Sequence, residues 1–161
     1  MSDEIPVEIK GLVPTPAGTG VFLGHGDKAI AIFIDSAVAM AITMQIENVE
    51  RPRPLTHDLI ASIFLGLGIR AVRVVIHDLK AGTFYARLHL LQENENGRQV
   101  AEIDARPSDC LAIALQQKCP VVVTRNVWEA ADDMSWARQE ANGGTTPPPD
   151  PDDEKTDEDP E

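Results

Sequence analysis

Two short motifs carry residue types suited to phosphoryl chemistry, and the first runs from Arg51 to Asp58. Its sequence, RPRPLTHD, brings Arg51, Arg53, a histidine and an aspartate to the expected start of a helix. A helix N-terminus offers unpaired N–H groups and positive potential, which suit a phosphate. His57 can exchange a proton, and the dipole favours its neutral form, so this position suits a general base. In a structural alternative, Thr56 caps the helix, Asp58 complements the dipole and the arginines are solvated.

The second motif runs from Asp104 to Asp109 with the sequence DARPSD, where an expected strand leads into a helix. Its two carboxylates suit Mg²⁺ or Mn²⁺, ions that assist phosphodiester cleavage. Arg106 would then stabilise charge on the phosphate. The structural alternative is a capping arrangement, with Ser108 and Asp109 in the first turn and Arg106 paired with a carboxylate.

A third group of polar residues lies on one face of a predicted β-hairpin formed by residues 69–79 and 83–91. Its members are Arg73, His77, Tyr85, Arg87 and His89. Residues 51–90 contain six basic and two acidic residues, and their charge of +4 makes them the locally basic part of the chain. This face is therefore a candidate for contacts with a nucleic-acid backbone. The alternative is the solvated face of an antiparallel sheet.

Hydrophobic patterns predict the elements that must position these groups. Strands are expected at residues 5–13, 20–23, 28–34, 69–79, 83–91, 99–104 and 120–124. Helices are expected at 37–46, 56–67 and 107–118, and a last helix is expected to bury Val127, Ala130, Met134 and Ala137. The fold class is therefore α+β: a mixed or antiparallel sheet with β-hairpins and about four helices, in a single domain.

Turn and capping residues set the expected boundaries of these elements. Ser36 and Thr56 are expected as N-caps, and Gly68 as the stop of the second helix. Lys80-Ala81-Gly82 is expected as a three-residue hairpin loop, which would oppose residues whose numbers sum to about 162. The helix at 37–46 has no continuous polar face, which predicts burial between layers or in a homo-oligomer.

Charge is unevenly distributed over the 161 residues, whose net charge is −12. Residues 143–161 contain eight acidic residues and one lysine, so they carry −7 of that charge. Residues 141–161 are therefore predicted to be a disordered, acidic, proline-rich tail that could contact a basic partner. The mildly acidic remainder excludes a generally basic nucleic-acid binder and leaves room only for a local basic patch.

The sequence also limits the expected location of the protein. No apolar stretch is long enough to predict a membrane span, and the acidic N-terminus does not resemble a secretory signal. Two cysteines, Cys110 and Cys119, do not form a disulfide framework. A reducing, cytoplasmic location is expected, with Cys110 as a buried structural thiol.

Two long segments resemble the bifunctional nuclease domain family, over about residues 10–133. They are RPLTHDLIASIFLGLGIRAVRVVIHDLKAGTFYARLHL and IDARPSDCLAIALQQKCPVVVTRNVWEAA. The resemblance implies an α+β domain at 10–140, preceded by a short segment at 1–9, that commonly self-associates and has nuclease activity on DNA and RNA in some members. The family motifs fall on 56–58, on Tyr85 and Arg87, and on 104–109. The family usually has a glutamate in the first helix where this chain has Val38, and Asp35 stands at a usual glycine position.

Two functions follow from these observations. The first is a metal-assisted phosphodiesterase acting on nucleic acid. Its catalytic residues would be His57, Asp58, Asp104 and Asp109, its substrate-binding residues Arg53, Arg73, Tyr85, Arg87 and Arg106, and its ligands for Mg²⁺ or Mn²⁺ Asp104 and Asp109. The second is a non-catalytic oligomeric binding module in which both motifs act as helix caps. Convergence of His57, Asp104 and Asp109 in one cleft would favour the first function.

Overall fold

A computed structural model describes residues 3–143 of the chain. The strands are β1 (Glu4–Thr15), β2 (Gly18–His25), β3 (Lys28–Ile34), β4 (Ile69–Lys80), β5 (Thr83–Asn94), β6 (Gly97–Ala105) and β7 (Val121–Thr124). The helices are α1 (Ser36–Ile46), α2 (Thr56–Leu67), α3 (Pro107–Gln117), α4 (Arg125–Ala130) and α5 (Ser135–Ala141). All but the first three residues of the predicted tail lie outside the described residues.

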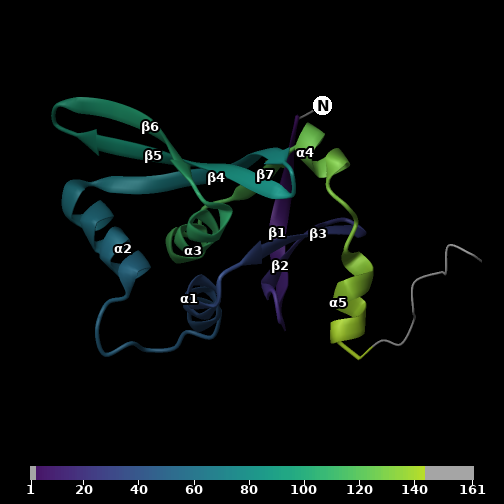
Figure 1. Cartoon of the computed structure of the whole chain (residues 1–161). Coiled ribbons are helices and arrows are strands. Elements are labelled where there is room, and N and C mark those ends of the chain that lie inside the picture. The colour runs from purple at the N-terminus through teal and green to yellow at the C-terminus, as the bar shows by residue number, and fades with distance from the viewer. Residues whose placement is uncertain (1–2, 144–161) are drawn as a thin grey trace, which may run out of the picture.

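One seven-stranded sheet connects these elements in the order β3-β2-β1-β7-β4-β5-β6 (Figure 1). β7 is parallel to β4, and the other neighbours are antiparallel. β1 joins the two parts of the sheet, because Glu4–Val7 pairs with β7 while Glu8–Thr15 pairs with β2, with a bulge between Ile9 and Gly11. The predicted α+β class with a mixed sheet in a single domain is confirmed.

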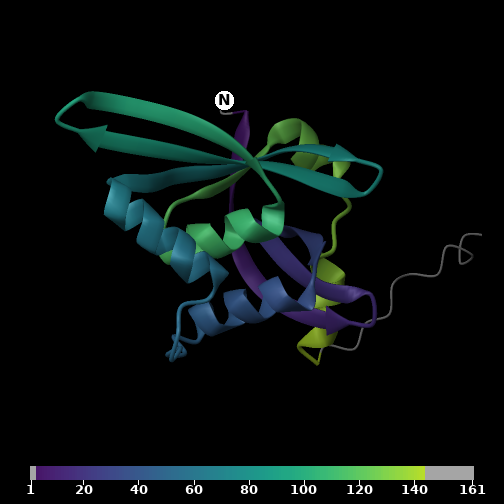
Figure 2. The same cartoon turned by 60° about the vertical axis from the view of Figure 1, so that its left-hand side comes forward.

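Two helices, α2 and α3, cover one face of the β4–β6 part of the sheet, which we call the inner face, and α1 packs against α3 and β2 (Figures 1 and 2). Val74, Ile76 and Ala86 alternate onto this face and are fully buried with Leu111 of α3. The intervening residues of β4 and β5 point to the opposite, outer face, because successive side chains of a strand alternate. No helix covers this outer face of β5 and β6 in Figure 1.

The β4–β5 hairpin differs from its predicted loop. Lys80 pairs with Thr83, so the turn has only two residues, Ala81 and Gly82. Both have positive φ, 48° and 77°, as a tight two-residue hairpin turn requires. A register shift between Ile76 and Asp78 absorbs the missing residue. The predicted pairing sum of 162 therefore holds for 73–76 and becomes 163 nearer the turn.

The two predicted N-caps are each displaced by one residue. Asp35, not Ser36, caps α1, because its Oδ1 accepts a hydrogen bond from the Val38 N–H at 3.0 Å. Leu55, not Thr56, occupies the N-cap position of α2. There the Asp58 carboxylate accepts the Leu55 N–H at 2.8 Å, which is the bond that the acidic residue makes in a capping box. Gly68 ends α2 in the left-handed region, as predicted.

The prediction of one last helix is wrong, because the chain breaks between α4 and α5. Asp133 accepts hydrogen bonds from the Ser135 and Ala29 N–H groups, at 3.0 and 3.4 Å. Lys28 Nζ donates to the carbonyls of Trp128 and Ala131. These contacts connect the break to the start of β3, so tertiary hydrogen bonds replace helical ones, and residues 3–143 form five helices.

Most apolar side chains of α2 are exposed to solvent. Of its 12 residues, only His57 and Phe64 are buried, and Leu65 is 85% exposed. On α1, Met40 and Ile46 are exposed as well. Homo-oligomerisation, which would cover such a surface, stays a prediction. None of the helices in residues 3–143 has the length and apolar character needed to cross a membrane.

Candidate functional site

The first turns of three helices meet around one arginine, Arg106, which precedes α3. Its guanidinium contacts Asp109 in the first turn of α3 and Asp35 at the N-cap of α1. Asp109 in turn contacts His57 in the first turn of α2. We call the four residues His57, Asp109, Arg106 and Asp35 the helix-start cluster. It unites the two predicted motifs with a residue that precedes the first helix.

The contact between His57 and Asp109 is the centre of this cluster. His57 Nε2 lies 3.0 Å from Asp109 Oδ1, although the residues are 52 positions apart in the chain. His57 is only 8% exposed, whereas the Asp109 side chain is 31% exposed, so the contact is shielded from water on the histidine side. A carboxylate in this position fixes the orientation of the imidazole and leaves Nδ1 as the nitrogen that Asp109 does not engage.

Arg106 holds both aspartates of the cluster while remaining accessible. Its Nε donates to Asp109 Oδ2 at 2.9 Å, and its Nη1 lies 3.3 Å from Asp35 Oδ2. Its side chain is 63% exposed. Its hydrogen bond with Asp109, followed by the charge attraction to that carboxylate, raises the pKa of Arg106. The guanidinium is thus a fixed and exposed positive charge beside the start of α3.

The two carboxyl groups of the cluster are stabilised as anions. Burial alone would raise the pKa of Asp109, but the contacts with Arg106 and His57 outweigh burial and hold this pKa below its ordinary value. The Val38 N–H has the largest effect in lowering the pKa of Asp35, and Arg106 adds to it. Both aspartates therefore stay ionised at neutral pH and accept hydrogen bonds.

Asp58 belongs to a second, separate set of contacts beside the cluster. Its carboxylate accepts two hydrogen bonds from Arg51, at 2.5 and 2.7 Å, and others from the Leu55 N–H and from Gln116 of α3. The hydrogen bond from Arg51 is the main cause of the lowered pKa of Asp58. These contacts attach the 51–58 segment to α3 and stabilise the N-terminus of α2. Asp58 therefore has a structural role at the start of this helix.

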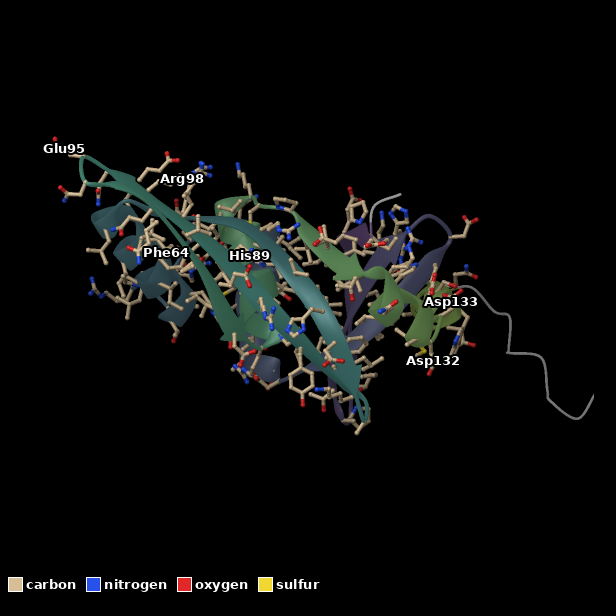
Figure 3. All side chains as sticks on the ribbon, turned by 90° about the horizontal axis from the view of Figure 1, so that it is seen from above. Phe64, His89, Glu95, Arg98, Asp132 and Asp133 are labelled. Atoms are coloured by element: carbon tan, nitrogen blue, oxygen red, sulfur yellow. The ribbon has the colours of Figure 1, made fainter. Side chains whose placement is uncertain are left out.

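The register of β4, β5 and β6 places most other predicted site residues on the outer face of the sheet. Arg73 forms two hydrogen bonds with Glu4, and Arg87 and His89 each lie 3.8 Å from Glu102. His89 is visible over β5 in Figure 3, which looks down on this face. The positive charges predicted here are thus partly neutralised by neighbouring glutamates.

Asp104 is also on the outer face. It pairs in register with Arg87 of β5, whereas the next residue, Ala105, packs against the core. Alternation along β6 therefore turns Asp104 away from the inner face. Among the described residues, Asp104 makes no hydrogen bond or ion pair with His57 or Asp109. Of the three residues whose convergence would favour a phosphodiesterase, the structure thus brings together only His57 and Asp109.

The remaining predicted residues have separate places. Arg53 is exposed in the segment between α1 and α2. Tyr85 is exposed opposite Asp78, and Lys80 Nζ lies 5.7 Å from the centre of its ring. Within residues 3–143, no three His, Cys, Asp or Glu side chains are grouped as ligands of a metal ion. Binding of Mg²⁺ or Mn²⁺ by Asp104 and Asp109 stays a prediction.

Asp35 of the helix-start cluster and Gln116, which contacts Asp58 beside it, were not among the predicted site residues. Asp35 could have been found for two reasons. An aspartate directly before a helix is a common N-cap, and the resemblance places a glycine at this position. Gln116 gives no signal in the sequence, because a glutamine inside a helix is ordinary. Val38, at the usual glutamate position, is buried in the core and contributes only its N–H, to Asp35.

Two hollows lie close to the helix-start cluster. A recess of about 10 Å³ is lined by His57, Asp58 and Gln116. A cavity of about 280 Å³ lies on the other side of Arg106, between β3, the β4–β5 turn and the start of α3. A larger apolar groove, of about 780 Å³, runs between β1 and the end of α3, but no predicted site residue lines it. We therefore place the candidate site at the helix starts.

Comparisons with known proteins agree with the motifs found at these helix starts. The model of the bifunctional nuclease domain family matches residues 21–134. An uncharacterized protein of Mycobacterium tuberculosis (strain H37Rv) is 42% identical over 103 residues, which are 64% of this chain and 58% of the relative. Bifunctional nuclease 1 of Oryza sativa subsp. indica is 26% identical over 105 residues, 63% of this chain and 30% of the relative. The chain thus spans little more than half of the bacterial relative and under a third of the plant one. The match over most of the described domain shows that this chain belongs to the bifunctional nuclease domain family.

Proposed function

We propose that this protein hydrolyses phosphodiester bonds of nucleic acid at the helix-start cluster. The observation that carries the proposal is the 3.0 Å contact between His57 and Asp109, which joins the two family motifs. Membership of the bifunctional nuclease domain family supports the same reaction class. The site combines a histidine oriented by a carboxylate with an exposed arginine, as a phosphodiesterase requires.

Each residue of the cluster has a distinct role in this proposal. His57 accepts a proton from the attacking water, and Asp109 is a positioning residue that orients the imidazole. Arg106 stabilises negative charge on the phosphate, and Asp35 positions Arg106. The side chains sum to −1 with His57 neutral. Three helix N-termini, each equivalent to roughly half a positive charge, offset this negative charge, so that an anion can still bind at the site.

Metal dependence is a question separate from the roles given above. The predicted ligands, Asp104 and Asp109, lie on different faces of the sheet, and Asp109 already contacts Arg106 and His57. These residues do not fit a shared ion in this arrangement, and the roles given above need none. Cleavage measured with added Mg²⁺, with added Mn²⁺ and with EDTA tests metal dependence directly.

The decisive experiment is a nuclease assay on the full chain with single-stranded DNA and RNA. His57→Ala should lower the cleavage rate about 100-fold or more, the usual scale for loss of a general base. The matched control is His25→Ala, which removes an exposed histidine of β2 remote from the cluster. Equal rates for wild type and His57→Ala, with both proteins folded, would exclude this site.

A second candidate function, a non-catalytic oligomeric binding module, is favoured by two observations. His57 is almost fully buried. Asp35 caps α1 by accepting the Val38 N–H, and Asp109 accepts a hydrogen bond from Arg106, so both aspartates already have structural partners. The exposed apolar side chains of α2 also offer a surface for a second copy. If the protein is a non-catalytic binding module, Asp109→Asn should lower the melting temperature and leave the background rate of nucleic-acid cleavage unchanged. Sedimentation should then show an oligomer at micromolar concentration.

A further inference from the structure

Beside Arg106 lies a cavity that the proposed reaction leaves unassigned, and its lining combines three kinds of group. Phe33 of β3 is 59% exposed and borders the cavity with its aromatic ring available to solvent. Arg106 and Asp35 form a charged side. Ser108, in the first turn of α3, forms part of the floor.

Ser108 is the unusual member of this lining. The residue is only 6% exposed, yet it lines the cavity. A hydroxyl that lines a cavity can donate a hydrogen bond to a ligand or to water there. Ser108 therefore supplies a hydrogen-bond donor where the cavity meets α3.

The start of α3 adds further donors at the same place. Arg106 is the N-cap of this 11-residue helix, and its side chain makes no capping hydrogen bond. Pro107 has no N–H, so the first N–H groups of the helix belong to Ser108 and Asp109. N–H groups of a first helical turn, a hydroxyl and a guanidinium together are donors that can bind a phosphate.

The opposite wall suits a base. Phe33 pairs with Gly20 of the neighbouring strand, where an added Cβ would be 3.5 Å from one ring atom, and its side chain remains 59% exposed. An exposed aromatic ring can stack on a nucleobase that is not paired within a duplex. A volume of about 280 Å³ lies near the lower end of ligand pockets, which are roughly 300–1,000 Å³, so it suits one nucleotide.

We propose that this cavity holds one nucleotide of single-stranded nucleic acid, with its base against Phe33 and its phosphate at Ser108 and Arg106. The inference rests on the proposed function. It names single-stranded nucleic acid as the substrate class, because a base inside a duplex is not free to stack on Phe33. The cavity is thereby a binding site for the strand next to the helix-start cluster.

Binding without turnover tests this inference. Fluorescein-labelled oligo(dT) of eight nucleotides is titrated into the full chain in EDTA at fixed low salt, and fluorescence anisotropy is measured. Phe33→Ala should weaken binding roughly 5- to 100-fold, and Ser108→Ala should weaken it about 10-fold. Binding of the dT·dA duplex of equal length should be at least about 5-fold weaker than that of the single strand.

The matched control is Val100→Ala, which removes an exposed apolar side chain of β6 away from the cavity and should keep the wild-type affinity. Titration with deoxythymidine 5′-monophosphate should also shift the amide resonances of Ser108 and Asp109. Wild-type affinity in both Phe33→Ala and Ser108→Ala, with unchanged melting temperatures, would overturn the inference, as would equal binding of duplex and single strand.

These results separate the inference from the proposed function. If the oligonucleotide binds as expected but is not cut under any metal condition, the cavity is correctly assigned and the proposed function is wrong. If the oligonucleotide is cut but both variants bind like wild type, the proposed function stands and the cavity is wrongly assigned.

Discussion

The helix-start cluster and the outer face of the sheet both contain arginine, histidine and acidic side chains, but they are built differently. In the cluster, residues from three helices meet in a chain of short contacts, and His57 is almost fully buried. On the outer face, Arg87 and His89 are neighbours along one strand and lie 3.8 Å from a shared glutamate.

This difference separates preorganised chemistry from a surface charge pattern. A buried histidine held by a carboxylate has one orientation, and a reaction can use it at no further ordering cost. The Arg87–Glu102 pair is exposed and screened by solvent, and at 3.8 Å the contacts with Glu102 contribute little energy. The cluster is therefore the better place for catalysis, although the outer face carries more of the predicted residues.

The largest expected effect comes from comparing the two aspartates of the second motif. Asp109→Asn removes the charge that orients His57 and should lower the nuclease rate about 100-fold. If the reaction is confined to the helix-start cluster, Asp104→Asn should lower the rate less than about threefold, since Asp104 lies on the outer face. Similar large losses for both variants would show that the two carboxylates act together, as a shared metal ion would require.

An intermediate effect is expected on stability from the ion pairs of the two regions. Asp58→Asn should lower the free energy of unfolding by about 1–3 kcal/mol, because it leaves the half-buried Arg51 without its anionic partner. The outer counterpart, Asp78→Asn, breaks an exposed pair with Lys80 and should leave the urea midpoint unchanged. Equal destabilisation by both changes would remove the contrast between the two regions.

A smaller effect follows from the pH dependence of the Asp58 contacts. The pKa of Asp58 is lower in the folded protein than its ordinary value of 3.8, so the unfolded chain binds the proton more readily. The stabilisation is therefore complete at pH values above about 4 and is lost as the pH falls through the folded pKa. The melting temperatures of wild type and Asp58→Asn should differ clearly at pH 6 and converge toward pH 3; a constant difference would contradict this.

Much of the framework could be predicted because local residue types determine it. Alternation in β4 and β5 gave the inner and outer faces and most of the hairpin register, and Gly68 gave the end of α2. The hairpin loop was misjudged by one residue, since a bulge at His77 is set by pairing across the strands rather than by the turn sequence. The break after α4 was missed because its hydrogen bonds come from Lys28 and Ala29, about 100 residues earlier.

The sequence by itself determined which residues could do chemistry: His57, Arg106 and two aspartates of the DARPSD motif, each beside a strand end or helix start. Only the tertiary structure decided which of them meet. It brought Asp109 to His57 and Asp35 to Arg106, and it turned Asp104 to the opposite face of the sheet. The physical reason is that local patterns set a side chain's direction within its own element. The contact between α2 and α3 depends on how both helices pack on a common core, which no single segment encodes.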